Sequence, residues 1–166
     1  FNRSADRPTD LNDASLQMIF DRIDPTAKTL VDIGCGRGYV LDLLNEKRPE
    51  LKTTGVDFHD NVPLKNSDYV SANVESLPFA DKSFDVVTCS HVIEHLKDLP
   101  KAIAEMKRVA RKQIIIATPC QRYYFYTLDL HVHFFPNEYS VSSLMGLKNY
   151  ECLKIDGDWL YLGKID

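Results

Sequence analysis

The hydrophobic pattern changes between two periods along most of the chain. Near the N-terminus, apolar residues recur at helical spacing from Leu16 to Ile23, and Pro25 ends the run, which predicts a helix over about 11–24. Short runs rich in β-branched and aromatic residues predict strands at 29–33, 53–58, 69–71, 84–89 and 113–117. Segments with helical spacing predict further helices at 39–46, 99–110 and 139–147.

Strands that alternate with helices predict an α/β protein, because parallel strands are joined by crossover helices that cover both faces of the sheet. The tail is different. Two β-rich runs, 151–155 and 159–165, flank Asp156-Gly157-Asp158, which is typical of an antiparallel hairpin. No repeat or linker interrupts the chain, and 166 residues have room for one core, so we expect a single domain over 1–166.

Composition narrows the class of protein. Apolar residues at 44% and charged residues at 27% exclude wholesale disorder, and no apolar run is long enough to span a membrane. The 20 basic and 24 acidic residues give a formal charge of −4, which disfavours nucleic acid as a partner. The four cysteines are widely spaced with no C-x-x-C pair, so we expect reduced thiols in a cytoplasmic protein, either a monomer or a homodimer.

A glycine-rich loop follows the first predicted strand. In Val31-Asp32-Ile33-Gly34-Cys35-Gly36-Arg37-Gly38, three alternating glycines allow a tight turn and let a ligand approach bare backbone. Asp57 ends the second strand, where a carboxylate can accept hydrogen bonds from both hydroxyls of a ribose. The nicotinamide fingerprint G-x-G-x-x-G would place its third glycine one residue later, at Tyr39, which disfavours the rival class of nicotinamide-binding Rossmann oxidoreductases.

Together with Asp57, the loop and Ser76-Leu77-Pro78-Phe79-Ala80-Asp81-Lys82-Ser83-Phe84-Asp85 resemble the class I S-adenosylmethionine-dependent methyltransferases, small-molecule "type 11" branch. The resemblance implies a Rossmann-like, mostly parallel seven-stranded sheet of order 3-2-1-4-5-7-6, with strand 7 antiparallel. It also implies S-adenosylmethionine as cofactor, S-adenosylhomocysteine as product, and a small-molecule acceptor. The chain departs from the family in lacking a Pro-Gly-Gly turn before the fifth strand. The helix between the second and third strands should be short or missing, since only 60–68 separate them.

The same resemblance identifies the residues expected to contact the cofactor. They are Asp32, Gly34, Cys35, Gly36, Gly38, Asp57, Phe58, Asn73, Val74, Glu75, Ser90 and His91. The loop residues would bound the methionine end, Asp57 would hold the ribose, and Phe58 would pack on adenine. Asn73 stands where the family usually has Asp, and its amide oxygen can still accept an N–H. Ser90 and His91 would line the site beside the methyl-bearing sulfur.

A competing interpretation concerns His91-Val92-Ile93-Glu94-His95, which matches the H-x-x-E-H pattern of zinc peptidases. His91 and His95 on one helix face could hold a metal, with Glu94 activating water and Glu138, Asp129, His131 or His133 completing the site. Such a site needs a continuous helix of at least two turns, whereas His91 follows a strand by one residue. We therefore predict no metal site of this kind and disfavour a zinc hydrolase.

The segment 119–149 is expected to form the acceptor side and lid of the site, because loops after the carboxyl ends of strands line the ligand crevice. Its rings could form a water-excluding wall or pack a lid helix onto the sheet, and we expect both uses. Where a general base is needed, His91, His133 and Tyr123 are the candidates. A cofactor-binding pseudoenzyme that acts as an interaction module remains an alternative, since the fold alone does not decide activity.

Overall fold

The computed structural model describes residues 8–123 and 130–166. Its helices are α1 (Asp13–Arg22), α2 (Tyr39–Lys47), the 3₁₀ turn η1 (Ile93–His95), α3 (Leu99–Val109) and α4 (Glu138–Met145). Its strands are β1 (Thr29–Ile33), β2 (Lys52–Asp57), β3 (Asp68–Ser71), β4 (Phe84–Ser90), β5 (Ala110–Pro119), β6 (Tyr150–Ile155) and β7 (Asp158–Lys164). Each of the strands and helices expected from the sequence is present, with shifts of a few residues at the ends.

The seven strands form one sheet in the order β3-β2-β1-β4-β5-β7-β6. Neighbouring strands from β3 to β5 run parallel, whereas β7 is antiparallel to both β5 and β6. This arrangement confirms the predicted Rossmann-like fold. The hairpin between β6 and β7 turns at Asp156 and Gly157, which both have positive φ (44° and 95°), as the Asp-Gly signal predicts.

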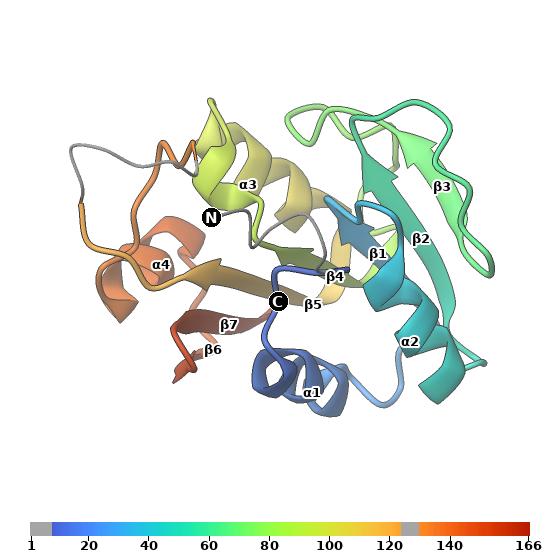
Figure 1. Ribbon diagram of the computed structural model, residues 1–166, viewed down its shortest axis with the longest axis horizontal. Helices are drawn as coiled ribbons and strands as arrows, with labels where there is room; N and C mark the ends of the chain where they lie inside the picture. Colours follow the sequence, from blue (N-terminus) through green and yellow to red (C-terminus); the bar gives the residue numbers. More distant parts are fainter. Residues whose placement is uncertain (1–7, 124–129) are drawn as a thin grey trace.

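Helices cover both faces of the sheet (Figure 1). Alternate residues of the buried strands point to opposite faces, so Leu30 packs with α1 and α2, whereas Val31 packs with α3 and α4. The face under α1 and α2 includes Ile19 and Leu41, both almost fully buried. No helix within 8–123 and 130–166 is both long enough and apolar enough to cross a membrane.

Two connections between elements are short. α3 passes directly into β5, because Ala110 is already extended (φ −77°, ψ 135°) and fully buried, so no turn separates helix from strand. Residues 58–67, all of which the structure describes, contain no helix. Leu64 from this connection lies instead against the backbone of Gly38 and Gly55, where an added Cβ would come within 2.4 Å and 2.7 Å of its side chain.

Candidate active site

The glycine loop takes its shape from the backbone. After β1, Gly34, Gly36 and Gly38 all have positive φ (75°, 53° and 81°), the left-handed region that residues with a Cβ rarely adopt. The amides of Gly34 and Cys35 both donate to the Val56 carbonyl oxygen of β2, at 2.7 Å and 3.0 Å. A Cβ on Gly34 would lie 2.2 Å from Val92 Cγ2, so this glycine is also needed for close packing.

Asp57 joins the end of β2 to this loop. Its side chain is almost completely buried; Oδ2 accepts a hydrogen bond from the Gly36 amide (2.9 Å) and Oδ1 accepts one from the Phe58 amide (2.8 Å). Each carboxylate oxygen can accept more than one hydrogen bond, so acceptor capacity remains for a ligand. The sequence placed Asp57 at the strand end, and the structure brings its carboxylate to the wall of a cavity.

Two cavities meet at the carboxyl ends of the parallel strands, where doubly wound folds bind ligands. The larger, of about 540 Å³, is lined by Val56 and Asp57 at the end of β2, by Phe58 directly after it and, after β3, by Ala72–Val74. The smaller, of about 170 Å³, has Asp32, Cys35 and Ser90 among its lining residues, together with 8–11 before α1. Gly34 and His91 line both, so the two cavities adjoin at these residues, and we call the two together the crevice.

Asp32 is the buried carboxyl group of the smaller cavity. Burial raises the pKa of Asp32 to about 7; the Thr88 hydroxyl, which donates to Oδ1 at 2.7 Å, opposes the shift, and the nearby Asp57 charge adds to it. Burial likewise raises the pKa of the neighbouring Cys35 thiol to about 12, so Cys35 stays protonated. Cys35 therefore contributes its backbone and the volume of its side chain to the cavity wall. A cation bound in the smaller cavity would favour the charged form of Asp32.

His91 stands between the cavities in an uncommon conformation for a side chain with a Cβ, at φ 54°. Its Nε2 lies 3.3 Å from Asp158 Oδ1 and its Nδ1 lies 3.6 Å from Glu94 Oε1. Burial alone would lower the pKa of His91, but the Asp158 carboxylate, supported by Glu94, outweighs it, so the pKa is raised above its ordinary value. Asp158 was interpreted as a turn residue; no local pattern identifies it as the partner of His91.

Comparison with known proteins decides the family. Residues 31–117, slightly more than half of the chain, match the family described as "Methyltransferase domain". The chain belongs to this methyltransferase family. The matched region contains the glycine loop, Asp57 and β4, so the resemblance seen in the sequence is confirmed.

Individual relatives agree with this assignment. A demethylmenaquinone methyltransferase of Thermotoga maritima is 27% identical over 55% of this chain and 42% of its own length. A probable S-adenosylmethionine-dependent methyltransferase of Mycobacterium tuberculosis is 32% identical over 62% of this chain and 40% of its own length. This chain thus matches about two fifths of the length of these relatives. A solved S-adenosylmethionine-dependent methyltransferase of Aquifex aeolicus has the same fold, with a TM-score of 0.74, 16% identity, and coverage of 97% of this chain and 95% of the other.

S-adenosylmethionine is the cofactor that this methyltransferase family and fold imply, and the crevice fits it. The buried Asp57 carboxylate can accept hydrogen bonds from ribose hydroxyls. Above Gly36 the smaller cavity is open, because a Cβ there would meet nothing within 4 Å. Asp32 supplies a buried carboxyl group where the cationic methionine end would lie. The two cavities thus suit a long ligand with an apolar end and a charged end.

The remaining cofactor residues predicted from the sequence fall into two groups. Phe58, Asn73 and Val74 line the larger cavity; the Phe58 ring is 76% exposed, so a flat ligand face can reach it. Asn73 Oδ1 accepts from the Glu75 amide at 2.9 Å. Glu75 lines neither cavity, and its Oε1 accepts from the Asp98 amide at the start of α3.

The acceptor-side candidates occupy different environments. Tyr123 is 77% exposed, with its ring centroid 5.7 Å from that of Phe134. His133 donates from Nε2 to the Leu96 carbonyl oxygen at 2.8 Å, which fastens the segment after residue 130 to the end of η1. Phe135 is buried in the core. Phe135 thus has the core-packing role expected for part of this segment, whereas Tyr123 and Phe134 line neither of the two cavities. Tyr124, Phe125, Tyr126 and Asp129 lie outside the described residues.

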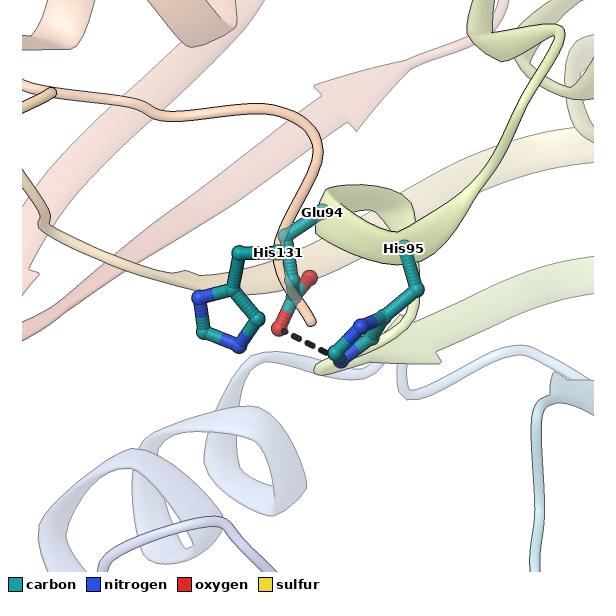
Figure 2. Close-up of side chains that lie close together, drawn as sticks. All are labelled: Glu94, His95 and His131. Atoms are coloured by element: carbon teal, nitrogen blue, oxygen red, sulfur yellow. Dashed lines mark ion pairs between the residues drawn. The ribbon is translucent and has the colours of Figure 1, made fainter. Parts of the chain in front are cut away.

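The H-x-x-E-H segment does not form the continuous helix that its zinc-peptidase interpretation needs, since η1 covers only Ile93–His95 and His91 precedes it. The structure instead brings Glu94 and His95 together with His131 (Figure 2). Glu94 is 1% exposed, and Oε2 accepts from the Thr118 hydroxyl at 3.2 Å. The sequence named these three residues within a larger set, but only tertiary contact selects them.

Proposed function

We propose that this chain transfers a methyl group from S-adenosylmethionine to a small-molecule acceptor, with residues 1–166 forming one methyltransferase domain. The observation that carries the proposal is the meeting of Asp57, the glycine loop and His91 at one crevice. The quinone methyltransferase among the relatives supports a small acceptor. We expect the adenosine end of the cofactor in the larger cavity and the methionine end in the smaller one.

The bound cofactor supplies an electrophilic methyl group on a sulfonium sulfur, and the chain contributes position and exclusion of water. Asp57 would orient the ribose, and Asp32 would face the positively charged methionine end of the cofactor. The backbone of the glycine loop would let the cofactor approach closely. His91 lines both cavities, and its Nε2 lies 3.3 Å from Asp158 Oδ1. Where the acceptor must lose a proton, His91 is therefore better placed than Tyr123, which is largely exposed, or His133, whose Nε2 is engaged with Leu96.

Calorimetric titration with S-adenosylhomocysteine and, separately, with NAD tests the cofactor assignment. We expect saturable binding of S-adenosylhomocysteine at one site per chain and no measurable binding of NAD. The matched variants are Asp57→Asn, which should weaken binding, and Asp60→Asn, an exposed carboxylate change nearby that should not. Tight binding of NAD without a response to S-adenosylhomocysteine would contradict the proposal and favour an oxidoreductase.

Turnover needs a separate assay, because a protein can bind the cofactor without transferring the methyl group. We would incubate the chain with methyl-labelled S-adenosylmethionine and a panel of small phenols, quinols and amines, and follow labelled product together with S-adenosylhomocysteine. Labelled product from at least one acceptor, lost in Asp57→Asn, is the expected result. Cofactor binding without turnover on the whole panel would favour an interaction module.

A further inference from the structure

We propose that Glu94, His95 and His131 form a binding site for one divalent transition-metal ion of the zinc type at the wall of the larger cavity. A ligand atom from each of the three side chains lies within 4.8 Å of the other two. Figure 2 shows the Glu94 carboxylate between the two imidazole rings, whose centroids are 4.7 Å apart. Bonds of about 2.0–2.1 Å to a tetrahedral ion place donor atoms about 3.3 Å apart, so side-chain shifts of about 1 Å would close the site.

The hydrogen bonds of the two histidines orient them for this role. His95 Nδ1 lies 3.4 Å from the Leu130 carbonyl oxygen, and His131 Nδ1 lies 2.6 Å from Gln121 Oε1. Both oxygens are acceptors, so each Nδ1 is the donating nitrogen, and in the neutral ring Nε2 is then the nitrogen that offers a lone pair. A histidine that binds a metal through one ring nitrogen usually donates a hydrogen bond from the other nitrogen to such an oxygen. This hydrogen bond fixes the tautomer and the orientation of the ring.

Glu94 gives the independent sign that a ligand belongs here. Its side chain is 1% exposed, yet Oε1 has no hydrogen-bond partner, while Oε2 accepts from Thr118. Oε1 lies 3.6 Å from His91 Nδ1 and 3.9 Å from His95 Nε2, and both distances are too long for a hydrogen bond. A buried carboxylate oxygen without a partner is costly, and a cation between Oε1 and the two Nε2 atoms would satisfy it.

The donor set points to the class of ion. One carboxylate oxygen and two imidazole nitrogens suit zinc, cobalt or nickel rather than magnesium or calcium, which prefer oxygen ligands. This set differs from the H-x-x-E-H interpretation, because His131 replaces His91, whose Nε2 faces Asp158. Three protein ligands leave coordination positions open for water or substrate.

The position of the ion would also select the chemical class of the acceptor, and this extension rests on the proposed function. His95 lines the larger cavity together with His91, so an ion held by His95 would lie beside the crevice. Its open positions would take an oxygen of the acceptor and orient that oxygen toward the methyl group. The preferred acceptors would then carry a hydroxyl or phenol group rather than an amine alone.

Metal titration of the chelator-treated protein tests the site without cofactor or acceptor. We would measure Zn²⁺ binding by calorimetry and Co²⁺ binding by its visible absorption, which reports nitrogen and oxygen ligands. We expect one equivalent to bind, and His95→Gln and His131→Gln each to weaken binding at least about tenfold. His59→Gln, an exposed histidine outside the cluster, is the matched control and should bind as the unmodified chain does.

Three results would overturn the proposal. They are no stoichiometric metal binding in the unmodified chain, binding as tight in His95→Gln and His131→Gln as in the unmodified chain, or loss of binding in His91→Gln with retention in His131→Gln. Glu94→Gln should also weaken metal binding. Because this substitution alters a buried group, its thermal unfolding is measured as well, and the conclusion rests on the His95→Gln and His131→Gln variants. S-adenosylhomocysteine titration of the same metal-free samples keeps the two proposals apart. Metal binding without S-adenosylhomocysteine binding would support the metal site and contradict the proposed function. S-adenosylhomocysteine binding without metal binding would support the proposed function and contradict the metal site.

Discussion

The two sides of the crevice, the one that we propose binds the cofactor and the one that we propose faces the acceptor, are constructed in different ways. On the cofactor side, the Gly34 and Cys35 amides and the Asp57 carboxylate are fixed by hydrogen bonds between neighbouring strand ends and the loop. On the acceptor side, His91, Glu94 and their neighbours are held by side chains from η1, β5 and β7 and by the chain after residue 130. The first side is mostly backbone geometry, whereas the second is mostly side-chain chemistry.

This difference teaches where the chain can vary. A backbone cradle tolerates few substitutions, because positive φ and close packing both exclude a Cβ. A wall of side chains can change its chemistry one residue at a time while the strands stay in place. We therefore expect substitutions on the cofactor side to damage stability and cofactor binding together, and those on the acceptor side to separate them.

The largest effect should come from Gly34→Ala. The substitution places a Cβ 2.2 Å from Val92 Cγ2 at a backbone with φ 75°, so steric overlap adds to conformational strain of about 1–2 kcal/mol. We expect a clear fall in the thermal unfolding midpoint and loss of S-adenosylhomocysteine binding. Gly157→Ala is the matched control, because φ is 95° and nothing lies within 4 Å of the added Cβ. Equal destabilisation by both variants would show that packing on Val92 is unimportant.

Asp57→Ala should come next. It removes the acceptor for the Gly36 amide and the expected ribose ligand, and hydrogen bonds to a charged group contribute about 1.5–3 kcal/mol. We expect the dissociation constant for S-adenosylhomocysteine, measured by calorimetry, to rise at least about tenfold. Asp60→Ala should leave it unchanged. An unchanged constant in Asp57→Ala would remove this residue from the cofactor side.

A pH profile tests Asp32. Its pKa is about 7 in the folded chain because of burial and near 3.8 in the unfolded chain, so between these values the folded state holds a proton that the unfolded state has lost. Stability from this group is therefore present at low pH and is lost as pH rises through that window, at up to about 1.4 kcal/mol per pH unit. In urea unfolding from pH 4 to 8, the unmodified chain should lose stability relative to Asp32→Asn. Parallel curves for the two proteins would contradict the raised pKa.

The smallest structural effect should come from Tyr123→Ala on the acceptor side. Its side chain is 77% exposed, so little packing is lost and the unfolding midpoint should move by no more than about 1 °C. S-adenosylhomocysteine affinity should stay the same, while KM for any acceptor found in the panel should rise. A fall in cofactor affinity would contradict the separation between the two sides.

The glycine loop and the strand end that carries Asp57 could be predicted from the sequence because their signals are local. Three alternating glycines after a β-rich run specify a turn into α2, and Asp57 follows from the end of the next strand. The order of strands needed the family resemblance in addition, since periodicity alone does not order a sheet.

The acceptor side could not be predicted to the same depth, because its contacts join distant residues. Asp158 is part of the Asp-Gly-Asp pattern that predicts the hairpin. No neighbouring residue in the sequence indicates that Asp158 lies next to His91. The same holds for Glu94 and His131, whose approach depends on His133 fastening its segment to Leu96. The H-x-x-E-H spacing contains Glu94 and His95, but it leaves His131 as one of four possible further ligands, and only the tertiary structure brings His131 to them.

The contacts of Asp158 bear on the order in which parts of the site form during folding. Its Oδ2 accepts hydrogen bonds from Asn12 and Ser15, about 2.9 Å and 3.1 Å away, and Ser15 precedes it by 143 residues along the chain. Contacts between such distant segments form late in folding, because closing a long loop costs entropy before the contact is gained. We expect the glycine loop to become ordered before His91 receives its partner. A refolding chain would therefore order the proposed cofactor loop before His91 and Asp158 come together.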